Sequence, residues 1–152
     1  MLVRKLAVAR VDFVLIGGLA VAVHGYERAT RDVDLVYSTE LVSCERLVGV
    51  LRTLDARVEF ADEPLGEAYD WVDALVAGGH FRFATEAGPL DAISWTEGRD
   101  YADLKRDAVE LKLDDTPLYA CSYEDLIRMK RAAGRPQDEA DLIALEDARR
   151  SS

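Results

Sequence analysis

Two carboxylates two residues apart are the first sign of chemistry in this chain. Asp32 and Asp34 lie in the run DVDLV, which reads as a strand. Side chains two apart in a strand project to the same face. Carboxylates held side by side repel each other unless a cation lies between them. The pattern therefore predicts a metal site, and Mg²⁺ is a hard cation that carboxylate oxygens suit.

A glycine pair precedes these acids. Gly17-Gly18 follows the apolar run Phe13 to Ile16, which is typical of a strand buried on both faces, and a helix is expected to begin at Leu19. A glycine turn between a strand and a helix leaves backbone N–H groups uncovered beside the positive end of the helix dipole. A phosphate cradle next to paired carboxylates predicts a nucleoside triphosphate, such as ATP, bound with magnesium.

The two features together resemble a known family. Gly17-Gly18, thirteen intervening residues and Asp32-x-Asp34 resemble the signature of the DNA polymerase β-type nucleotidyltransferase superfamily. The longer pattern Arg28-x-Thr30-x-Asp32-x-Asp34 is similar to its small bacterial branch, which includes toxin–antitoxin nucleotidyltransferases. An isolated Asp-x-Asp is also typical of a solvated strand face, so the resemblance depends on the distance from the glycine turn.

A third acid stands in a later apolar strand. The stretches 80–85 and 89–94 are predicted to form a hairpin around the turn at 86–88. Asp91 lies in the second strand, where a lone carboxylate is costly unless it is paired or bound to metal. The resemblance implies that a third carboxylate completes the metal site near the acceptor hydroxyl, and Asp91 is the best match. The alternative is a strand-edge Asp that faces water.

Four residues are candidates for binding the nucleotide besides the glycines. Arg28 and Thr30 match positions of the family pattern, and Arg28 is either a phosphate ligand or half of a salt bridge that braces the loop. Lys130 and Arg135 belong to a C-terminal run that resembles a motif of the same branch, together with the acids at 138 and 141. They either contact phosphate or form an internal ion-pair network with those acids.

The remaining pattern predicts an α/β protein, with a small mixed sheet, packed helices and a helical C-terminus. One domain is expected over 1–152, with a catalytic sheet core at 13–113 and C-terminal helices at 122–149. Further elements are expected as a helix at 2–9, a helix at 40–55 capped by Ser38 or Thr39, a strand at 57–60, a helix within 64–79, a loop at 95–98, a helix at 101–108, strands at 109–113 and 118–121, and a helix capped by Ser122.

Composition limits the classes of function. The 152 residues carry a formal net charge of −10, which argues against a grip on long nucleic acid but not against a nucleotide or an RNA end. No apolar run is long enough to span a membrane and no cleavable signal pattern stands at the N-terminus, so a cytoplasmic location is expected. Cys44 and Cys121 are expected to be buried free thiols.

The resemblance implies a metal-dependent nucleotidyltransferase. Asp32, Asp34 and Asp91 would hold two Mg²⁺ ions, or Mn²⁺, and a nucleoside monophosphate would pass from the triphosphate to an RNA end, a protein side chain or a small molecule. A role in a toxin–antitoxin system, with a cognate toxin or antitoxin as partner, is also implied. The alternative is a non-catalytic interaction module with this fold, such as an antitoxin partner. The oligomeric state is not predicted.

Overall fold

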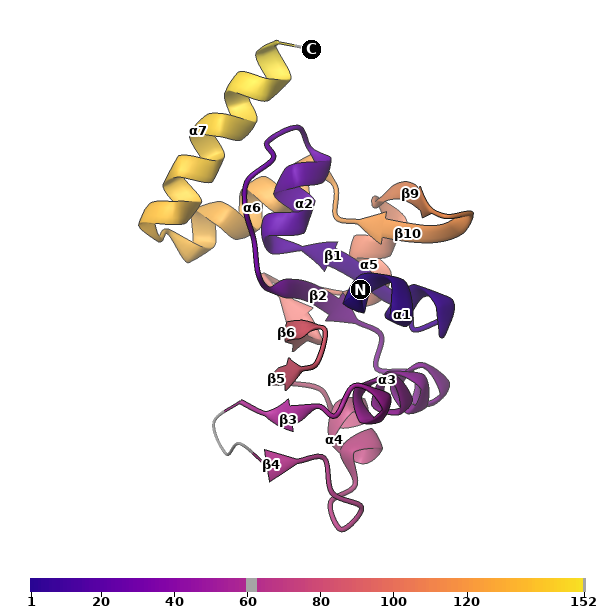
Figure 1. Cartoon of the computed structure of the whole chain (residues 1–152). Coiled ribbons are helices and arrows are strands. Elements are labelled where there is room, and N and C mark those ends of the chain that lie inside the picture. Colours follow the sequence, from indigo (N-terminus) through magenta and orange to yellow (C-terminus); the bar gives the residue numbers. More distant parts are fainter. Residues whose placement is uncertain (60–62, 152) are drawn as a thin grey trace.

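The computed structural model describes residues 1–59 and 63–151, and its centre is a mixed β-sheet (Figure 1). The strands described in this sheet are β1 (Phe13–Ile16), β2 (Val33–Tyr37), β3 (Arg57–Val58), β4 (Glu63–Pro64), β5 (His80–Thr85), β6 (Gly88–Ile93), β9 (Val109–Leu113) and β10 (Thr116–Ala120). Their order across the sheet is β4-β3-β5-β6-β2-β1-β10-β9. The pairs β2–β6 and β1–β10 are parallel and the other pairs are antiparallel, so the predicted mixed sheet is confirmed.

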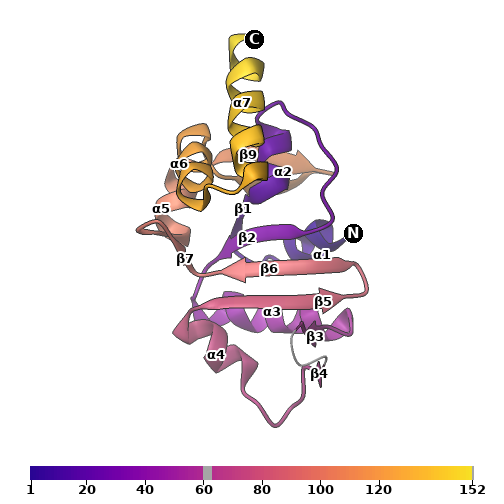
Figure 2. The same ribbon diagram turned by 90° about the vertical axis from the view of Figure 1, so that its left-hand side faces the viewer.

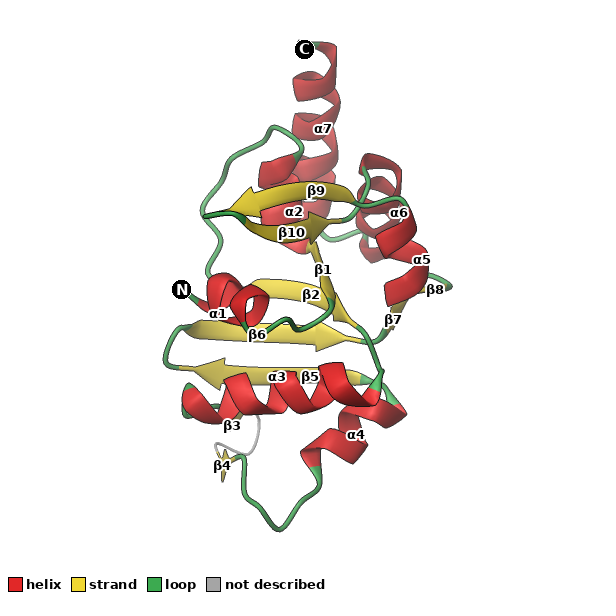
Figure 3. Cartoon of the chain, turned by 90° about the vertical axis from the view of Figure 1, so that its right-hand side faces the viewer, coloured by secondary structure: helices red, strands yellow, loops and turns green. Residues whose placement is uncertain are grey.

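Helices cover both faces of the sheet. The described helices are α1 (Leu2–Val8), α2 (Gly17–Val23), α3 (Leu41–Thr53), α4 (Trp71–Ala77), α5 (Tyr101–Arg106), α6 (Tyr123–Ala133) and α7 (Pro136–Arg150). One apolar cluster joins α1, α3 and α4 to the sheet, and a second joins α2, α5, α6 and α7 to its other face. Figure 3 shows α1, α3 and α4 together on one side, and Figure 2 shows α2, α6 and α7 grouped near β1.

Strand alternation decides which face receives the acids. In β2, Leu35 belongs to the first cluster and Val36 to the second. Asp34 lies two residues before Val36 and therefore projects to the face covered by α2 and α6. In β6, Leu90 and Ala92 belong to the first cluster, so Asp91 between them projects to that same second face.

The predicted loop at 95–98 is wrong. Trp95–Thr96 forms β7, which pairs with β8 (Arg99–Asp100) in a separate two-stranded sheet. Glu97 and Gly98 between them both have positive φ, 48° and 78°, which is the conformation of a two-residue hairpin turn. The sequence pattern missed this hairpin because Glu97, unlike Asn, Asp or Gly, is not a residue that favours the positive φ of its turn position.

Other differences lie at the ends of elements. The predicted side-chain caps of α3 are wrong: Glu40 is the N-cap residue without a side-chain hydrogen bond, and Ser38 Oγ accepts from the Glu40 N–H at 3.2 Å. α4 begins only at Trp71, after the cap Asp70, and α5 ends two residues before the predicted end at 108.

The helix cap at Ser122 is confirmed, since its Oγ accepts from Asp125 N–H at 3.1 Å. Residue 60 of the strand expected at 57–60 lies outside the described residues.

Two predictions from composition can be checked. Cys44 and Cys121 are buried and free, as expected. In the ranges 1–59 and 63–151, no helix has the length and apolar content that crossing a bilayer requires.

Candidate active site

The parallel pairing of β2 and β6 brings two acids together. Asp34 and Asp91 are Cα partners in the register of these strands, and their side chains project to the same face. Neighbouring strands lie about 4.8 Å apart, so the carboxylates are close although 56 residues of chain separate them. Asp32 stands just before β2 and lines the same cavity. The structure therefore brings the three predicted acids to one place.

The surroundings of Asp34 raise its pKa. Burial, followed by the neighbouring charges of Asp91 and Asp32, raises the pKa of Asp34 to about 6, against a partial lowering by more distant cations. Within the described residues, its carboxylate makes no hydrogen bond or ion pair. A half-buried carboxylate without a paired cation is suited to bind a metal ion.

Asp91 differs from Asp34 because it has partners on β5. His80 Nε2 is hydrogen-bonded to Asp91 Oδ1, and Arg82 lies opposite Asp91 in the hairpin register with its Nη1 3.9 Å from Oδ2. Arg82 also donates to Glu59 at 3.1 Å. Sequence reasoning missed His80 and Arg82 as site residues. The turn predicted at 86–88 is one residue too long, because Gly88 already belongs to β6 and pairs with Thr85. The two-residue turn at 86–87 sets the register that places Arg82 against Asp91.

The glycine pair allows the acidic strand to approach α2. Gly17 is the first residue of α2 and has φ +63°, and a Cβ there would lie 2.9 Å from Asp34 Cγ. A Cβ on Gly18 would lie 2.9 Å from Thr30 Oγ1. Both distances are shorter than real contacts allow, so side chains are excluded at both positions. Thr30 Oγ1 in turn donates to the Asp32 carbonyl at 3.3 Å.

The predicted cations are already paired with the helical acids. Arg28 donates from Nε and Nη2 to both oxygens of Asp141, at 2.9 and 3.0 Å. Lys130 Nζ lies 3.1 Å from Asp138 and 2.9 Å from Asp141. Arg135 Nε donates to Asp138 at 2.6 Å. The ion-pair network that the sequence left open as an alternative is present.

This network is buried and its acids are charged. The side chains of Asp138 and Asp141 are 1% and 0% exposed, and that of Lys130 is 7% exposed. Burial raises the pKa of Asp138, but the hydrogen bonds from Arg135 and Lys130 outweigh it and lower that pKa overall. The pKa of Asp141 is lowered in the same way by Arg28 and Lys130 against the effect of burial. Gln137, which sequence reasoning missed, also donates to Asp141 at 2.9 Å.

Two adjoining cavities lie between the acids and this network. One of about 400 Å³ is lined by the three strand acids and by an apolar wall that includes Ile93 and Met129. The other, of about 220 Å³, lies over the glycine pair. Together they are lined by all nine residues chosen from the sequence, namely Gly17, Gly18, Arg28, Thr30, Asp32, Asp34, Asp91, Lys130 and Arg135.

The donor set suits a hard divalent cation, because its atoms are carboxylate oxygens. The raised pKa of Asp34 and its lack of a partner in the described chain also fit such an ion. In the parts of the chain that the structure describes, however, no three His, Cys, Asp or Glu side chains converge into a ready-made metal cluster. The three acids line one cavity, but their carboxylates do not meet at one position. Asp91 contacts His80.

The architecture is that of a nucleotidyltransferase fold, and solved structures share it. The lincomycin-bound lincosamide antibiotic adenylyltransferase LnuA is similar, with a TM-score of 0.58 and 17% identity over 88% of this chain and 85% of that chain. The candidate nucleotidyltransferase TM1012 from Thermotoga maritima has a TM-score of 0.55 and 13% identity over 95% of this chain and 89% of that chain. No protein-family model and no curated protein matches the sequence.

At these identities the likeness shows the fold alone. The predicted α/β nucleotidyltransferase fold is thereby confirmed. The similarity of fold does not distinguish the toxin–antitoxin branch from other proteins with this fold.

Proposed function

We propose that this protein is a metal-dependent nucleotidyltransferase, which moves a nucleoside monophosphate from a triphosphate such as ATP to an acceptor hydroxyl. The observation that carries the proposal is the register of Asp34 and Asp91 beside the Gly17 turn, with Asp34 unpaired among the described residues and its pKa raised. The nucleotidyltransferase fold of LnuA and TM1012 supports it. We treat 1–152 as one unit, with 13–113 as the sheet core and 122–149 as the C-terminal helices.

The residues divide into two roles. Gly17, Gly18, Arg28 and Thr30 line the smaller cavity and would receive the triphosphate, with Lys130 and Arg135 at its wall. Asp32, Asp34 and Asp91 would hold Mg²⁺, with two ions or with Mn²⁺ in its place. When bound, the metal supplies charge neutralisation and makes the acceptor hydroxyl more acidic.

The chain's own groups then position the reaction. The acceptor oxygen forms a bond to the α-phosphorus while the bond from that phosphorus to the pyrophosphate oxygen breaks, and pyrophosphate leaves. Asp91 lines the cavity on the side away from Gly18 and would take the hydroxyl proton. Holding the two reactants in line accounts for much of the acceleration in such a reaction.

The lining of the larger cavity indicates which kind of acceptor would bind there. Ile16, Ile93, Leu126 and Met129 form the apolar part of the lining. This apolar part supports a small-molecule acceptor over an RNA end or a protein side chain. LnuA, whose name gives a lincosamide antibiotic as acceptor, has the same fold. The net charge of −10 further disfavours a long nucleic acid.

The test is transfer of label from α-labelled triphosphates with Mg²⁺ to a panel of small hydroxyl compounds, RNA ends and proteins. We expect transfer by the wild type and a loss of about a hundredfold or more in Asp34→Asn. Asp147→Asn, an exposed acid on α7, is the matched control and should retain activity. No transfer by the wild type, or equal transfer by Asp34→Asn, would refute the enzyme.

One observation favours the non-catalytic interaction module instead. Arg28, Lys130 and Arg135 are all engaged by Asp138 or Asp141, as expected of cations with a structural role. An antitoxin-like partner would bind its cognate toxin equally well after Asp32, Asp34 and Asp91 are all changed to Asn. Binding of this kind, measured with a co-expressed partner, would replace the enzyme proposal.

The toxin–antitoxin role is a separate part of the proposal, supported by the pattern Arg28-x-Thr30-x-Asp32-x-Asp34. A toxin of this class would arrest growth when its expression is induced, and Asp34→Asn would relieve the arrest. Unimpaired growth under full induction of the wild type would exclude a toxin.

A further inference from the structure

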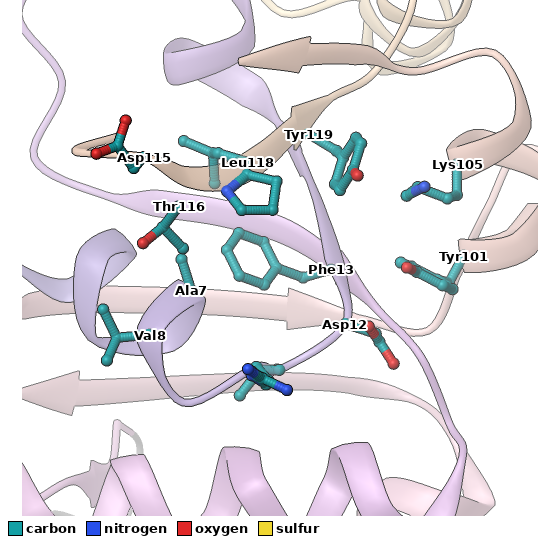
Figure 4. Close-up of a pocket in the computed structure, with 13 residues that line it drawn as sticks. Ala7, Val8, Asp12, Phe13, Tyr101, Lys105, Asp115, Thr116, Leu118 and Tyr119 are labelled. Atoms are coloured by element: carbon teal, nitrogen blue, oxygen red, sulfur yellow. The ribbon is translucent and has the colours of Figure 1, made fainter. Parts of the chain in front are cut away.

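A larger cavity, of about 620 Å³, lies at the opposite end of β1 from the glycine pair (Figure 4). It is enclosed by α1, α5 and the β9–β10 hairpin. The parallel pairing of β1 and β10 registers only Leu15 with Ala120, so Phe13 and Leu118, two residues earlier on each strand, are not ladder partners. The space between them is in the size range of small-molecule sites.

Aromatic rings line this cavity and one of them already holds a cation. Phe13, Tyr101 and Tyr119 contribute the rings. The ammonium of Lys105 lies 3.8 Å from the centroid of the Tyr119 ring, and Figure 4 shows it pointing toward that ring. An ammonium over the face of a tyrosine is attracted by the negative charge of the π-system. The chain's own lysine therefore shows where an ammonium group is stabilised in this cavity.

Carboxylates outnumber bases around the cavity once Lys105 is set aside. The other charged residues of the lining are two acids and one base, namely Asp12, Asp115 and Arg10. The hydroxyl of Tyr119 also donates to Glu110 at 3.2 Å. Burial, followed by the charge of Asp12, raises the pKa of Tyr101 to about 12. An excess of carboxylates beside aromatic faces favours an organic cation.

We propose that this cavity is a second ligand site, which binds a small organic cation with an ammonium group and a short apolar body. The ammonium takes the place of Lys105 on the Tyr119 ring, near the carboxylate of Asp12. The apolar body lies against Val11 and Leu118, which also line the cavity. Because β1 runs from this cavity to Gly17, the ligand would act at one end of the strand whose other end borders the acids.

The alternative is that Lys105 is itself the ligand-binding group and the cavity takes a small anion. The two possibilities predict opposite changes in ligand affinity for one variant. Lys105→Gln removes a competitor of a cationic ligand but removes the partner of an anionic one. Tyr119→Leu removes the ring that a cation needs, while Tyr119→Phe keeps it.

The test uses choline and its uncharged isostere 3,3-dimethylbutan-1-ol, titrated by calorimetry at fixed ionic strength. We expect choline to bind about threefold or more tightly to Lys105→Gln than to the wild type, and about threefold or more weakly to Tyr119→Leu. Tyr119→Phe should keep the affinity, and the isostere should bind more weakly than choline. Asp34→Asn should not change choline binding, which separates this site from the proposed active site.

Three outcomes would overturn the proposal. They are weaker choline binding by Lys105→Gln, equal binding of choline and its isostere, and the absence of saturable choline binding by both the wild type and Lys105→Gln. Unchanged circular dichroism spectra of each variant would show that the differences do not come from unfolding.

Discussion

Two groups of acids lie beside the same cavities, which the strand acids and Asp138 line, and their surroundings are opposite. The helical acids Asp138 and Asp141 are almost fully buried, and each is hydrogen-bonded by Lys130 and an arginine. The strand acid Asp34 is half-buried, and the largest charge effects on its pKa come from two other carboxylates. Burial acts on both groups, so the difference between them comes from the cations.

The pKa values express this difference. Hydrogen bonds from basic side chains lower the pKa values of Asp138 and Asp141 although burial raises them. In contrast, burial and the charges of Asp91 and Asp32 raise the pKa of Asp34 to about 6. The helical acids therefore stabilise the fold in their charged form. The charged form of Asp34 destabilises the fold until a cation arrives, which is the property expected of a site that binds a metal ion.

The largest effect is expected from breaking the helical network. Asp141→Asn leaves Lys130 and Arg28 without a full counter-charge, and removing one partner of a buried ion pair costs about 3 kcal/mol. Chemical denaturation at pH 7 measures this loss in the free energy of unfolding. The exposed control Asp147→Asn should change it by less than about 0.5 kcal/mol. A similar small change in Asp141→Asn would show that the network is dispensable.

The same change of Asp to Asn in the strand group should change the free energy of unfolding in the opposite direction. Asp34 has a folded pKa of about 6 against 3.8 for the unconstrained group, so its charging opposes folding. Without metal, Asp34→Asn should raise the free energy of unfolding at pH 7.5 by about 1–2 kcal/mol, less than the full linkage value because water reaches the cavity.

The pH dependence of this gain follows from the same shift. Because the pKa of Asp34 is raised, the contribution of this one group to stability is fully present below about pH 4 and is lost as pH rises through 6. The difference between the two proteins should therefore disappear on acidification. A destabilised Asp34→Asn at pH 7.5, measured in chelator, would contradict the unpaired state of Asp34.

A somewhat smaller effect is expected from adding metal. A ligand that binds only the folded state at ten times its dissociation constant stabilises by about 1.4 kcal/mol. Mg²⁺ should raise the melting temperature of the wild type accordingly and should have little effect on Asp34→Asn. Equal stabilisation of both proteins would place the ion elsewhere.

The smallest effect is expected at the edge of the network. The side chain of Arg135 is 73% exposed, so its ion pair with Asp138 is screened by water. Arg135→Gln should lower the free energy of unfolding by less than about 1 kcal/mol, because Lys130 still neutralises Asp138. A loss as large as that of Asp141→Asn would mean that the two acids do not share Lys130.

The sequence was sufficient for the positions of the strand acids. Alternation places Asp32 and Asp34 on one face, the hairpin at 80–94 places Asp91 in a strand interior, and the structure pairs that strand with β2. These are local patterns, and the confirmed helix start at Ser122 is also set by a local signal, the side-chain cap.

The partners of the cations could not be chosen from the sequence. Arg28 and Asp141 are 113 positions apart, and nothing in either local pattern shows that they meet. Both phosphate contact and an internal network were compatible with the types of residue at 28, 130 and 135. The pairing of these basic side chains with Asp138 and Asp141 depends on how α6 and α7 pack beside α2. In contrast, the pairing of Arg82 with Asp91 follows from the hairpin register.

The most direct test of this account is the titration of Asp34 itself, followed by NMR of protein labelled with ¹³C at its aspartate carboxyl groups. Without divalent ions, we expect the Asp34 resonance to titrate with a pKa of about 6. Saturating Mg²⁺ should lower that pKa by about one unit or more, while Asp138 and Asp141 remain charged throughout. A pKa near 3.8 for Asp34, or a raised pKa that Mg²⁺ does not change, would contradict a metal site at these carboxylates.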